Sequence, residues 1–452
     1  MIKNILPQVR SIFVGRRPEL EELEGLWNFT LKDVEHPVYV FLNAPGVGKT
    51  TLIHHFGKQR EVKRIGIFIK LTCSRDYDSP FRLNKNIIKS VEKTITQRLP
   101  IIDHYLSNEV EKEQRERLRE KFKRLQDFLS KILLKAKVSI NDIHEVFMDL
   151  SEIIPIFFAA DEIQEFQKLV FESIEGGDET ALHYFTRTLK SFLNLRMMVI
   201  LSGTRYHILS QIGGKIGSPI REKVEPLVVT NFNQEEILEY VDQVSHIIKG
   251  AETYQLNRSI SILLKNYSQF LLAFSGGHPR TIEKITKLFL DNFAYLIEHP
   301  EHQGYAAFVE FLLPLCERSF GNNLLTKEKE EQLIALSSHA QFSSVKKWMV
   351  GRSHDGLALG SYPEDVNPNV REETEEIIYS LMNLGFLVQN GMFNYYLTSY
   401  FHLTAFLKPF HEKHEMFLKE VLHNEFFELM WGFHSGFGYT FENVFTAALL
   451  IH

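Results

Sequence analysis

The sequence predicts an α/β fold: a parallel sheet with flanking helices, followed by a helical region and a C-terminal winged-helix-like domain. Three observations predict it. From about residue 36 to 230, short apolar runs rich in β-branched residues alternate with longer segments of helical pattern. From about 231 to 300 the pattern is helical throughout. Further along, after more helical pattern, two short strand-like runs flank an Asn390-Gly391 turn.

The strands of the expected sheet are short and almost wholly apolar, which is typical of parallel strands buried on both faces. We expect them at Val38–Leu42, Ile65–Leu71, Ile154–Ala160, Met197–Leu201 and Leu227–Val229. About 80 residues separate the second strand from the third, far more than one crossover helix needs. The sequence therefore predicts helices inserted there, at Asn86–Arg98, Glu109–Leu134 and Ile140–Ile153.

The composition of the 452-residue chain, 44% hydrophobic and 24% charged, excludes a disordered or collagen-like protein. Its apolar runs reach only about eight residues, too short to cross a bilayer, and two distant cysteines, Cys73 and Cys316, suit a reducing compartment. We therefore expect a soluble intracellular protein, cytoplasmic or nuclear, without a membrane partner. The net charge of −6 is uneven, because residues 301–452 hold 10 Lys and Arg against 19 Asp and Glu. That balance argues against a DNA-binding surface in the C-terminal third.

One loop carries the strongest chemical signal. The first strand runs directly into a glycine-containing loop and then a helix; the loop residues are Asn43, Ala44, Pro45, Gly46, Val47, Gly48, Lys49, Thr50 and Thr51. This is the context of a phosphate-binding loop, where backbone N–H groups and a helix N-terminus surround phosphate oxygens. We expect Lys49 to reach the β- and γ-phosphates and Thr50 to ligate Mg²⁺. Asn43 replaces the usual first glycine, and we expect it to tolerate the left-handed backbone of a bent loop. The alternative is a mere tight turn.

The third expected strand ends in two carboxylates, Asp161 and Glu162. Burying such charge is costly unless something compensates it, and a magnesium ion with a polarised water would do so. We expect Asp161 to hold the metal and Glu162 to orient and deprotonate the attacking water. The alternative is a pair of solvent-exposed loop acids.

Two further segments place polar residues where a γ-phosphate could be sensed. The fourth strand ends in Ser202 and Thr204, which could touch the γ-phosphate or the water, and Arg205 could stabilise charge in the transition state. In the helical region, Ser275-Gly-Gly-His-Pro precedes Arg280, a candidate sensor of the γ-phosphate. A helix-start arginine with no such role is the alternative.

The segment Ile12–Leu20 looks like the "FxGRxxEL" motif of AAA+-related ATPases. Together with the motifs above, residues 12–300 resemble the STAND and archaeal-type ATPases, relatives of the origin-recognition and helicase-loader ATPases. The resemblance implies ATP rather than GTP, a helical lid after the sheet and a winged helix after the lid. It also implies an adenine slot near Phe13, Val14, Gly15 and Arg16, and an arginine finger at about Arg221.

A finer resemblance is to the ATPase modules of crinkler and retrotransposon-hot-spot proteins, in which a nuclease domain often follows. It rests on the helical insertion, the winged helix and a Gly436-Phe-Gly-Tyr-Thr-Phe-Glu442 segment. The chain ends ten residues after Glu442, before such a site could be completed. Either the nuclease is absent from this chain or the segment is an amphipathic terminal helix, which we favour.

The predicted domains are an ATPase core over 1–230 with its insertion at about 80–150, a lid over 231–305, a winged-helix-like domain over 306–410, and a C-terminal helical segment over 411–452. We expect the lid to begin with a capping box in which Asn233 is the N-cap and Glu236 its partner. The leading hypothesis is an ATP-hydrolysing switch that needs Mg²⁺, and we expect it to self-associate or bind a protein partner. The alternatives are a nucleotide-gated adaptor with little hydrolysis, and the ATPase module of a DNA-acting, nuclease-linked system.

Overall fold

The computed structural model describes residues 12–32, 37–171, 179–204, 224–250, 258–351, 358–361, 368–390 and 394–410. The chain forms two compact units. We call Arg16–Asn43 with Gly48–Val229 the sheet unit, and Met1–Gly15 with Ala44–Val47 and Thr230–His452 the second unit. The segment Ala44–Val47, in the loop predicted to bind phosphate, groups with the second unit, although the residues before and after it in the sequence belong to the sheet unit.

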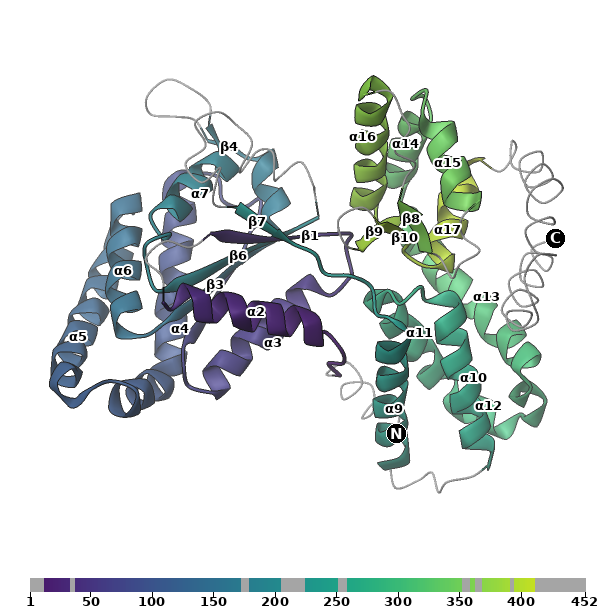
Figure 1. Ribbon diagram of the computed structural model, residues 1–452, viewed down its shortest axis with the longest axis horizontal. Coiled ribbons are helices and arrows are strands. Elements are labelled where there is room, and N and C mark those ends of the chain that lie inside the picture. The colour runs from purple at the N-terminus through teal and green to yellow at the C-terminus, as the bar shows by residue number, and fades with distance from the viewer. Residues whose placement is uncertain are drawn as a thin grey trace. The chain divides into compact units, whose positions relative to one another are not determined.

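The sheet unit is built on five parallel strands in the order β2-β3-β6-β1-β7 (Figure 1). Their bounds are β1 Val38–Leu42, β2 Ile67–Thr72, β3 Ile156–Asp161, β6 Met197–Gly203 and β7 Val224–Leu227. The predicted α/β class with a parallel sheet is confirmed. The last strand begins three residues before its predicted start and ends two residues before its predicted end. It is an edge strand that contains Glu225 and Pro226, both exposed, so it has no apolar run to announce it, and an edge tolerates proline.

Side chains alternate between the two faces of the sheet, and each face has its own helices. On one face, Val40, Ile69 and Phe158 belong to the core formed with the helices that follow β2 and β3. On the other face, Phe157 packs at 5.2 Å from the ring of Phe56 on α3. The helices of the unit are α2 Arg17–Thr30, α3 Lys49–Val62, α4 Pro80–Asn108, α5 Lys112–Leu134, α6 Ile140–Ile153 and α7 Ala181–Lys190; the short elements η1 Ile163–Lys168, β4 Val170–Phe171 and β5 Glu179–Thr180 lie between β3 and α7.

The predicted helical insertion is present, and two of its three helices have the predicted extent to within a few residues. The first is longer than predicted: α4 begins at Pro80, where Ser79 accepts a bond from the Arg82 N–H, and continues to Asn108. Its backbone departs from helical angles at Arg98, two residues before Pro100. Proline removes a helical N–H and clashes with the preceding turn, so the chain kinks there without ending the helix.

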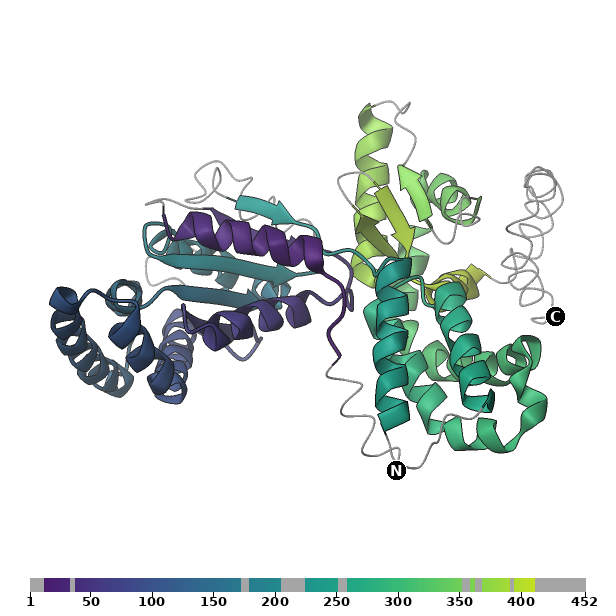
Figure 2. The same cartoon turned by 60° about the horizontal axis from the view of Figure 1, so that its bottom comes forward.

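The second unit begins with a group of helices around one apolar core (Figure 2). They are α9 Gln234–Gly250, α10 Arg258–Phe274, α11 Pro279–Asp291, α12 Phe293–Glu298, η4 Pro300–Gln303 and α13 Tyr305–Leu324. The predicted capping box at the start of α9 is confirmed. The Asn233 Oδ1 accepts from the Glu236 N–H at 2.9 Å, and the Glu236 carboxylate accepts from the Asn233 N–H at 2.8 Å.

The rest of the second unit combines helices with a small antiparallel sheet. The helices are α14 Lys327–Leu336, α15 Phe342–Gly351, α16 Pro368–Leu384, α17 Tyr400–Leu407 and η5 Lys408–Phe410; the strands are β8 Ala358–Ser361, β9 Leu387–Asn390 and β10 Asn394–Leu397, in the order β8-β10-β9. The two predicted hairpin strands are thus present, while the winged-helix assignment stays a prediction. The segment 411–452, predicted to be helical, lies outside the described residues.

In the part of the chain that the structure describes, no helix is both long enough and apolar enough to span a membrane.

Candidate functional site

The loop between β1 and α3 has the backbone of a turn that only glycine adopts easily. Gly46 and Gly48 have φ of 90° and 97°, and Gly48 is the N-cap residue of α3. The expectation for Asn43 is wrong in its reason, because its backbone is not left-handed. Instead its side-chain N–H donates to the carbonyl of Val229 at 2.7 Å, in a buried position. The first loop position is therefore fixed by the chain that leaves β7.

Lys49 lies at the first turn of α3 and is almost fully buried. Its ammonium donates to the carbonyl oxygen of Asn43 at 2.7 Å, so the side chain turns back along the loop. This places a positive charge beside the loop and at the N-terminus of a helix, the two features that attract a phosphate group. Thr51, which is also predicted to bind nucleotide, is exposed.

The carboxylate of Asp161 is the centre of a small polar cluster. It lies at the end of β3, and its Oδ2 accepts from the Thr50 hydroxyl at 2.9 Å and from the Lys70 ammonium at 3.1 Å. Only 8% of the Asp161 side chain is exposed, so the two donors replace the water that the buried charge has lost. Sequence reasoning missed Lys70. The sequence signal that could have identified Lys70 is that it is the single charged residue in the apolar run Ile67–Leu71 of β2, the strand that pairs with β3.

Glu162 follows directly and has a left-handed backbone, with φ of 65° and ψ of 37°. A non-glycine residue held in this region costs of the order of 1 kcal/mol or more, and such residues cluster at functional sites. Its carboxylate accepts from the Gln164 side-chain N–H at 2.7 Å. The side-chain carbonyl oxygen of Gln164, Oε1, accepts from the Thr204 N–H at 3.3 Å. This buried glutamine, also missed from the sequence, ties Glu162 to the end of β6.

The end of β6 lies beside Asp161. Ser202 is paired with Asp161 in the parallel register and is buried, whereas Thr204 is partly exposed. The sheet thus brings Asp161, Glu162, Ser202 and Thr204 to one edge, as expected for the carboxyl ends of parallel strands. Arg205, predicted to act in the transition state, and Arg221, the suggested arginine finger, lie outside the described residues.

Cys73 directly follows β2 and carries a thiol beside the Asp161 cluster. Its N–H donates to the Asp161 carbonyl at 2.8 Å, and its thiol is buried. Burial raises the pKa of the Cys73 thiol well above its usual value, and the neighbouring carboxylates of Asp161, Glu162 and Glu165 raise it further. Both effects favour the protonated thiol over the nucleophilic thiolate.

Within the second unit, the loop residues Ala44–Val47 contact the start of α11. The His278 ring lies with Nε2 3.0 Å from the Pro45 carbonyl oxygen, and the Arg280 N–H donates to the Gly46 carbonyl oxygen at 3.3 Å. The predicted sensor, Arg280, is thus next to the loop through its backbone, and its side chain is exposed.

The segment predicted to form the adenine slot is held in a bent conformation. Gly15 and Arg16 have φ of 63° and 60°. Val14 is buried in the apolar core of the second unit, and Phe13 is partly exposed. Arg16 is buried, and its guanidinium donates to the Glu19 carboxylate at 2.8 Å.

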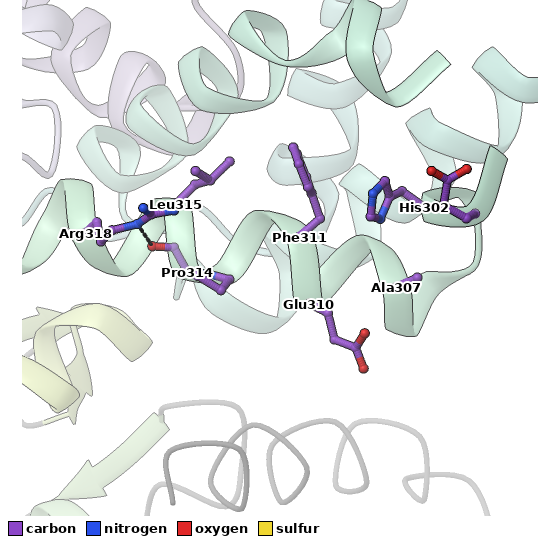
Figure 3. Close-up of a pocket in the computed structure, with 8 residues that line it drawn as sticks. His302, Ala307, Glu310, Phe311, Pro314, Leu315 and Arg318 are labelled. Carbon is purple, nitrogen blue, oxygen red and sulfur yellow. Dashed lines mark hydrogen bonds between the residues drawn. The ribbon is translucent and has the colours of Figure 1, made fainter. Parts of the chain in front are cut away.

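A separate cavity of about 500 Å³ opens along α13 and η4 (Figure 3). Figure 3 shows His302, Phe311 and Arg318 along it, and its lining contains no residue of the phosphate loop. Two carboxylates, Glu301 and Glu310, complete its polar part. Across the described residues, no group of three or more His, Cys, Asp or Glu side chains is placed to hold a metal ion.

No protein-family model and no curated protein matches the chain. Among solved structures it is similar to the Aeropyrum pernix ORC2 protein in ADPNP–ADP complexes, with 12% identity and a TM-score of 0.47 over 90% of this chain and 96% of that one. It is also similar to Cdc6p from Pyrobaculum aerophilum, with 13% identity and a TM-score of 0.39 over 89% and 97% of the two chains. A third is AMPPCP-bound DnaA from Aquifex aeolicus, with 14% identity and a TM-score of 0.33 over 74% and 83%. Origin-recognition proteins, the group that the sequence motifs resemble, are thus among the structures found. At these identities the likeness concerns the fold alone.

Proposed function

We propose that this protein is an ATP-binding and ATP-hydrolysing switch. The observation that carries the proposal is the contact between Thr50 and Asp161 at 2.9 Å. It joins the first turn after a glycine loop to the end of β3, a buried strand separated from β1 by β6, with Lys49 beside Thr50 and Glu162 next to Asp161 in sequence. Phosphate-transferring P-loop proteins need this combination, because the phosphates, the metal and the attacking water must meet at one point.

In this proposal the loop residues 43–51 surround the β- and γ-phosphates with backbone N–H groups, and Lys49 supplies a positive charge to them. The hydroxyl of Thr50 and the carboxylate of Asp161 fit Mg²⁺, since both offer oxygen atoms, the donors that this ion prefers. Bound there, Mg²⁺ would neutralise charge developing on the phosphate oxygens. Lys70, which pairs with the same carboxylate oxygen, compensates the charge of Asp161 in the protein without metal.

Glu162 is proposed to orient and deprotonate the attacking water. Its backbone strain and its bond to Gln164 fix the direction of a carboxylate that is otherwise exposed to solvent. Ser202 and Thr204 are proposed to contact the γ-phosphate or the water, Arg205 to stabilise the transition state, and Arg280 to sense the γ-phosphate. The segment from Phe13 to Arg16 is proposed to hold adenine.

Loss of the γ-phosphate is proposed to reposition a lid at 231–305 and a winged-helix-like domain at 306–410, and thereby to control assembly with further copies or a protein partner. The acidic C-terminal third does not favour DNA as the ligand of that region.

A second candidate function is a nucleotide-gated adaptor that hydrolyses ATP slowly. Its support is Asn43, which occupies the usual position of the first loop glycine and is fixed by a buried bond to Val229. A loop held in this way can bind phosphates while losing the freedom to adjust during transfer.

The proposal is tested by calorimetric titration of the protein with ATP and with GTP in the presence of Mg²⁺. We compare the parent with Lys49→Ala and with Lys58→Ala, a control on the same helix whose ammonium pairs with Glu61 and is 40% exposed. Hydrogen bonds to charged groups contribute about 1.5–3 kcal/mol, so Lys49→Ala should weaken ATP binding by roughly 10- to 150-fold. The control should bind as the parent does. Equal ATP affinity in the parent and Lys49→Ala, or no binding in either, would sink the proposal.

A further inference from the structure

Within the second unit, a buried histidine contacts the phosphate loop through both a hydrogen bond and its ring. His278 is 2% exposed and precedes α11. Because a carbonyl oxygen can only accept, its Nε2 donates to Pro45 O at 3.0 Å, while its Nδ1 lies 2.8 Å from the Thr281 hydroxyl. The ring is also in close contact with the loop, since a Cβ added at Gly46 would come within 2.7 Å of its Cε1 and Nε2. Both ring nitrogens are thus engaged.

This attachment sets the direction of the loop's N–H groups. In a trans peptide the C=O and N–H point in opposite directions, and no cis peptide occurs in the described residues. The Pro45 carbonyl faces His278, so the Gly46 N–H faces away from it. The Gly46 carbonyl faces the Arg280 N–H at 3.3 Å, so the Val47 N–H also faces away. Two successive N–H groups are therefore directed to the other side of the loop, which is how a backbone nest for an anion is built.

The same histidine contacts the C-terminal part of the unit. Its ring lies 5.3 Å from the ring of His402 on α17, with an angle of 81° between the planes. His402 is fixed in turn by the Ser399 hydroxyl, 2.7 Å from its Nδ1. Pro45 has a second neighbour there, since a Cβ added at Gly385, just before β9, would lie 3.5 Å from its ring. The loop, α11 and α17 consequently meet at His278.

We propose that His278 is a positioning residue that orients the phosphate loop for its anion and couples occupation of the loop to the environment of α17. The inference rests on the proposed function, because the anion is the phosphate of the bound nucleotide. His278 does not touch the reacting atoms in this account; it acts through the carbonyl of Pro45.

The test uses two substitutions that separate the nitrogens of the ring. Glutamine places its amide N–H near the position of Nε2, whereas asparagine reaches only the position of Nδ1. The full-length parent, His278→Gln and His278→Asn are titrated with ATP and Mg²⁺, with thermal unfolding of each variant as a check on folding. We expect His278→Gln to bind ATP within about threefold of the parent and His278→Asn to bind about tenfold more weakly, as for a lost hydrogen bond that leaves a buried carbonyl unpaired.

Coupling is read from hydrogen exchange of the α17 amides with and without ATP. The parent should show slower exchange in Tyr400–Leu407 when ATP binds. His402→Leu, which removes the ring contact but keeps the bond to Pro45, should bind ATP like the parent and lose this response. Equal ATP affinities in His278→Asn, His278→Gln and the parent would overturn the positioning role. An unchanged response in His402→Leu, or no response in the parent, would overturn the coupling. If the parent itself failed to bind ATP, the proposed function would be wrong and this inference with it.

Discussion

Lys70→Met should destabilise the protein without nucleotide much more than the protein with Mg²⁺ and an ATP analogue. Lys70 Nζ lies 3.1 Å from Asp161 Oδ2, and the two side chains are 31% and 8% exposed. At an effective dielectric constant of about 20, the Coulomb attraction at this distance is about 5 kcal/mol. Desolvation of the ammonium offsets part of it, and Thr50 still donates to the carboxylate, so we expect a net loss of about 1–3 kcal/mol. When Mg²⁺ occupies the site, it compensates Asp161 itself, and the loss should fall below about 1 kcal/mol.

Scanning calorimetry of the parent and variant, with and without saturating Mg²⁺ and a non-hydrolysable ATP analogue, measures both values. For a unit of this size 1 kcal/mol corresponds to about 2–4 °C in Tm, so the shift should be about 2–12 °C without nucleotide and below about 2–4 °C with it. Lys58→Met is the matched control: its partner Glu61 is on the same helix, and we expect the same small shift, below about 2 °C, in both states. An equal destabilisation by Lys70→Met with and without the analogue would refute the placing of the metal at Asp161.

Three further predictions concern single residues. Gln164→Leu should lower the rate of ATP turnover by roughly 10- to 100-fold with little change in ATP affinity, because it removes the hydrogen bond that orients the carboxylate of Glu162. An equal loss of ATP affinity would contradict this prediction. In denaturant titrations, Gly277→Ala should lower the free energy of unfolding by about 2–4 kcal/mol, because its φ is +70° and an added Cβ would collide with a backbone oxygen. In the control Gly304→Ala, the added Cβ has no atom within 4 Å, and the free energy of unfolding should change by less than about 0.5 kcal/mol. Burial, a neighbouring histidine and nearby cations lower the pKa of His402 well below its usual value. As the pH drops below about 6.5, the unfolded chain therefore takes up a proton before the folded protein does, and the free energy of unfolding falls. In His402→Leu this fall should be shallower; a fall as steep as in the parent would contradict the prediction.

Much of the fold could be predicted because its signals are local. Buried parallel strands are continuous apolar runs, and Val38–Leu42 was predicted with its observed bounds. The capping box at Asn233 and Glu236 is a pattern of two residues at fixed spacing. Strand β7 was misplaced because an edge strand with a glutamate and a proline lacks the apolar run on which the prediction depended. Helix α4 was predicted to end at Arg98, ten residues early, because a proline usually ends a helix and here only bends it.

Sequence motifs indicated residues of the candidate site such as Lys49, Asp161 and Glu162, but not the contacts there that depend on the pairing of strands. The parallel register brings Asp161 beside Ser202, and the lysine on β2 reaches the same carboxylate. Nothing in the local sequence of Lys70 or Gln164 shows those partners. The predicted left-handed backbone of Asn43 was also wrong. Its side chain instead donates to the carbonyl of Val229, 186 positions away in the chain, and the local sequence cannot show such a partner.

The most direct test of the central claim is steady-state phosphate release from ATP and from GTP with Mg²⁺, in the parent, Lys49→Ala and Glu162→Gln. A positioned general base contributes about 10²- to 10⁴-fold, so turnover should prefer ATP, fall by that factor in Glu162→Gln and be lost in Lys49→Ala, while Glu162→Gln still binds ATP. Release at the parental rate by Glu162→Gln would contradict the assignment of the base. Absence of turnover in a parent that binds ATP through Lys49 would contradict the hydrolysing switch and leave the nucleotide-gated adaptor.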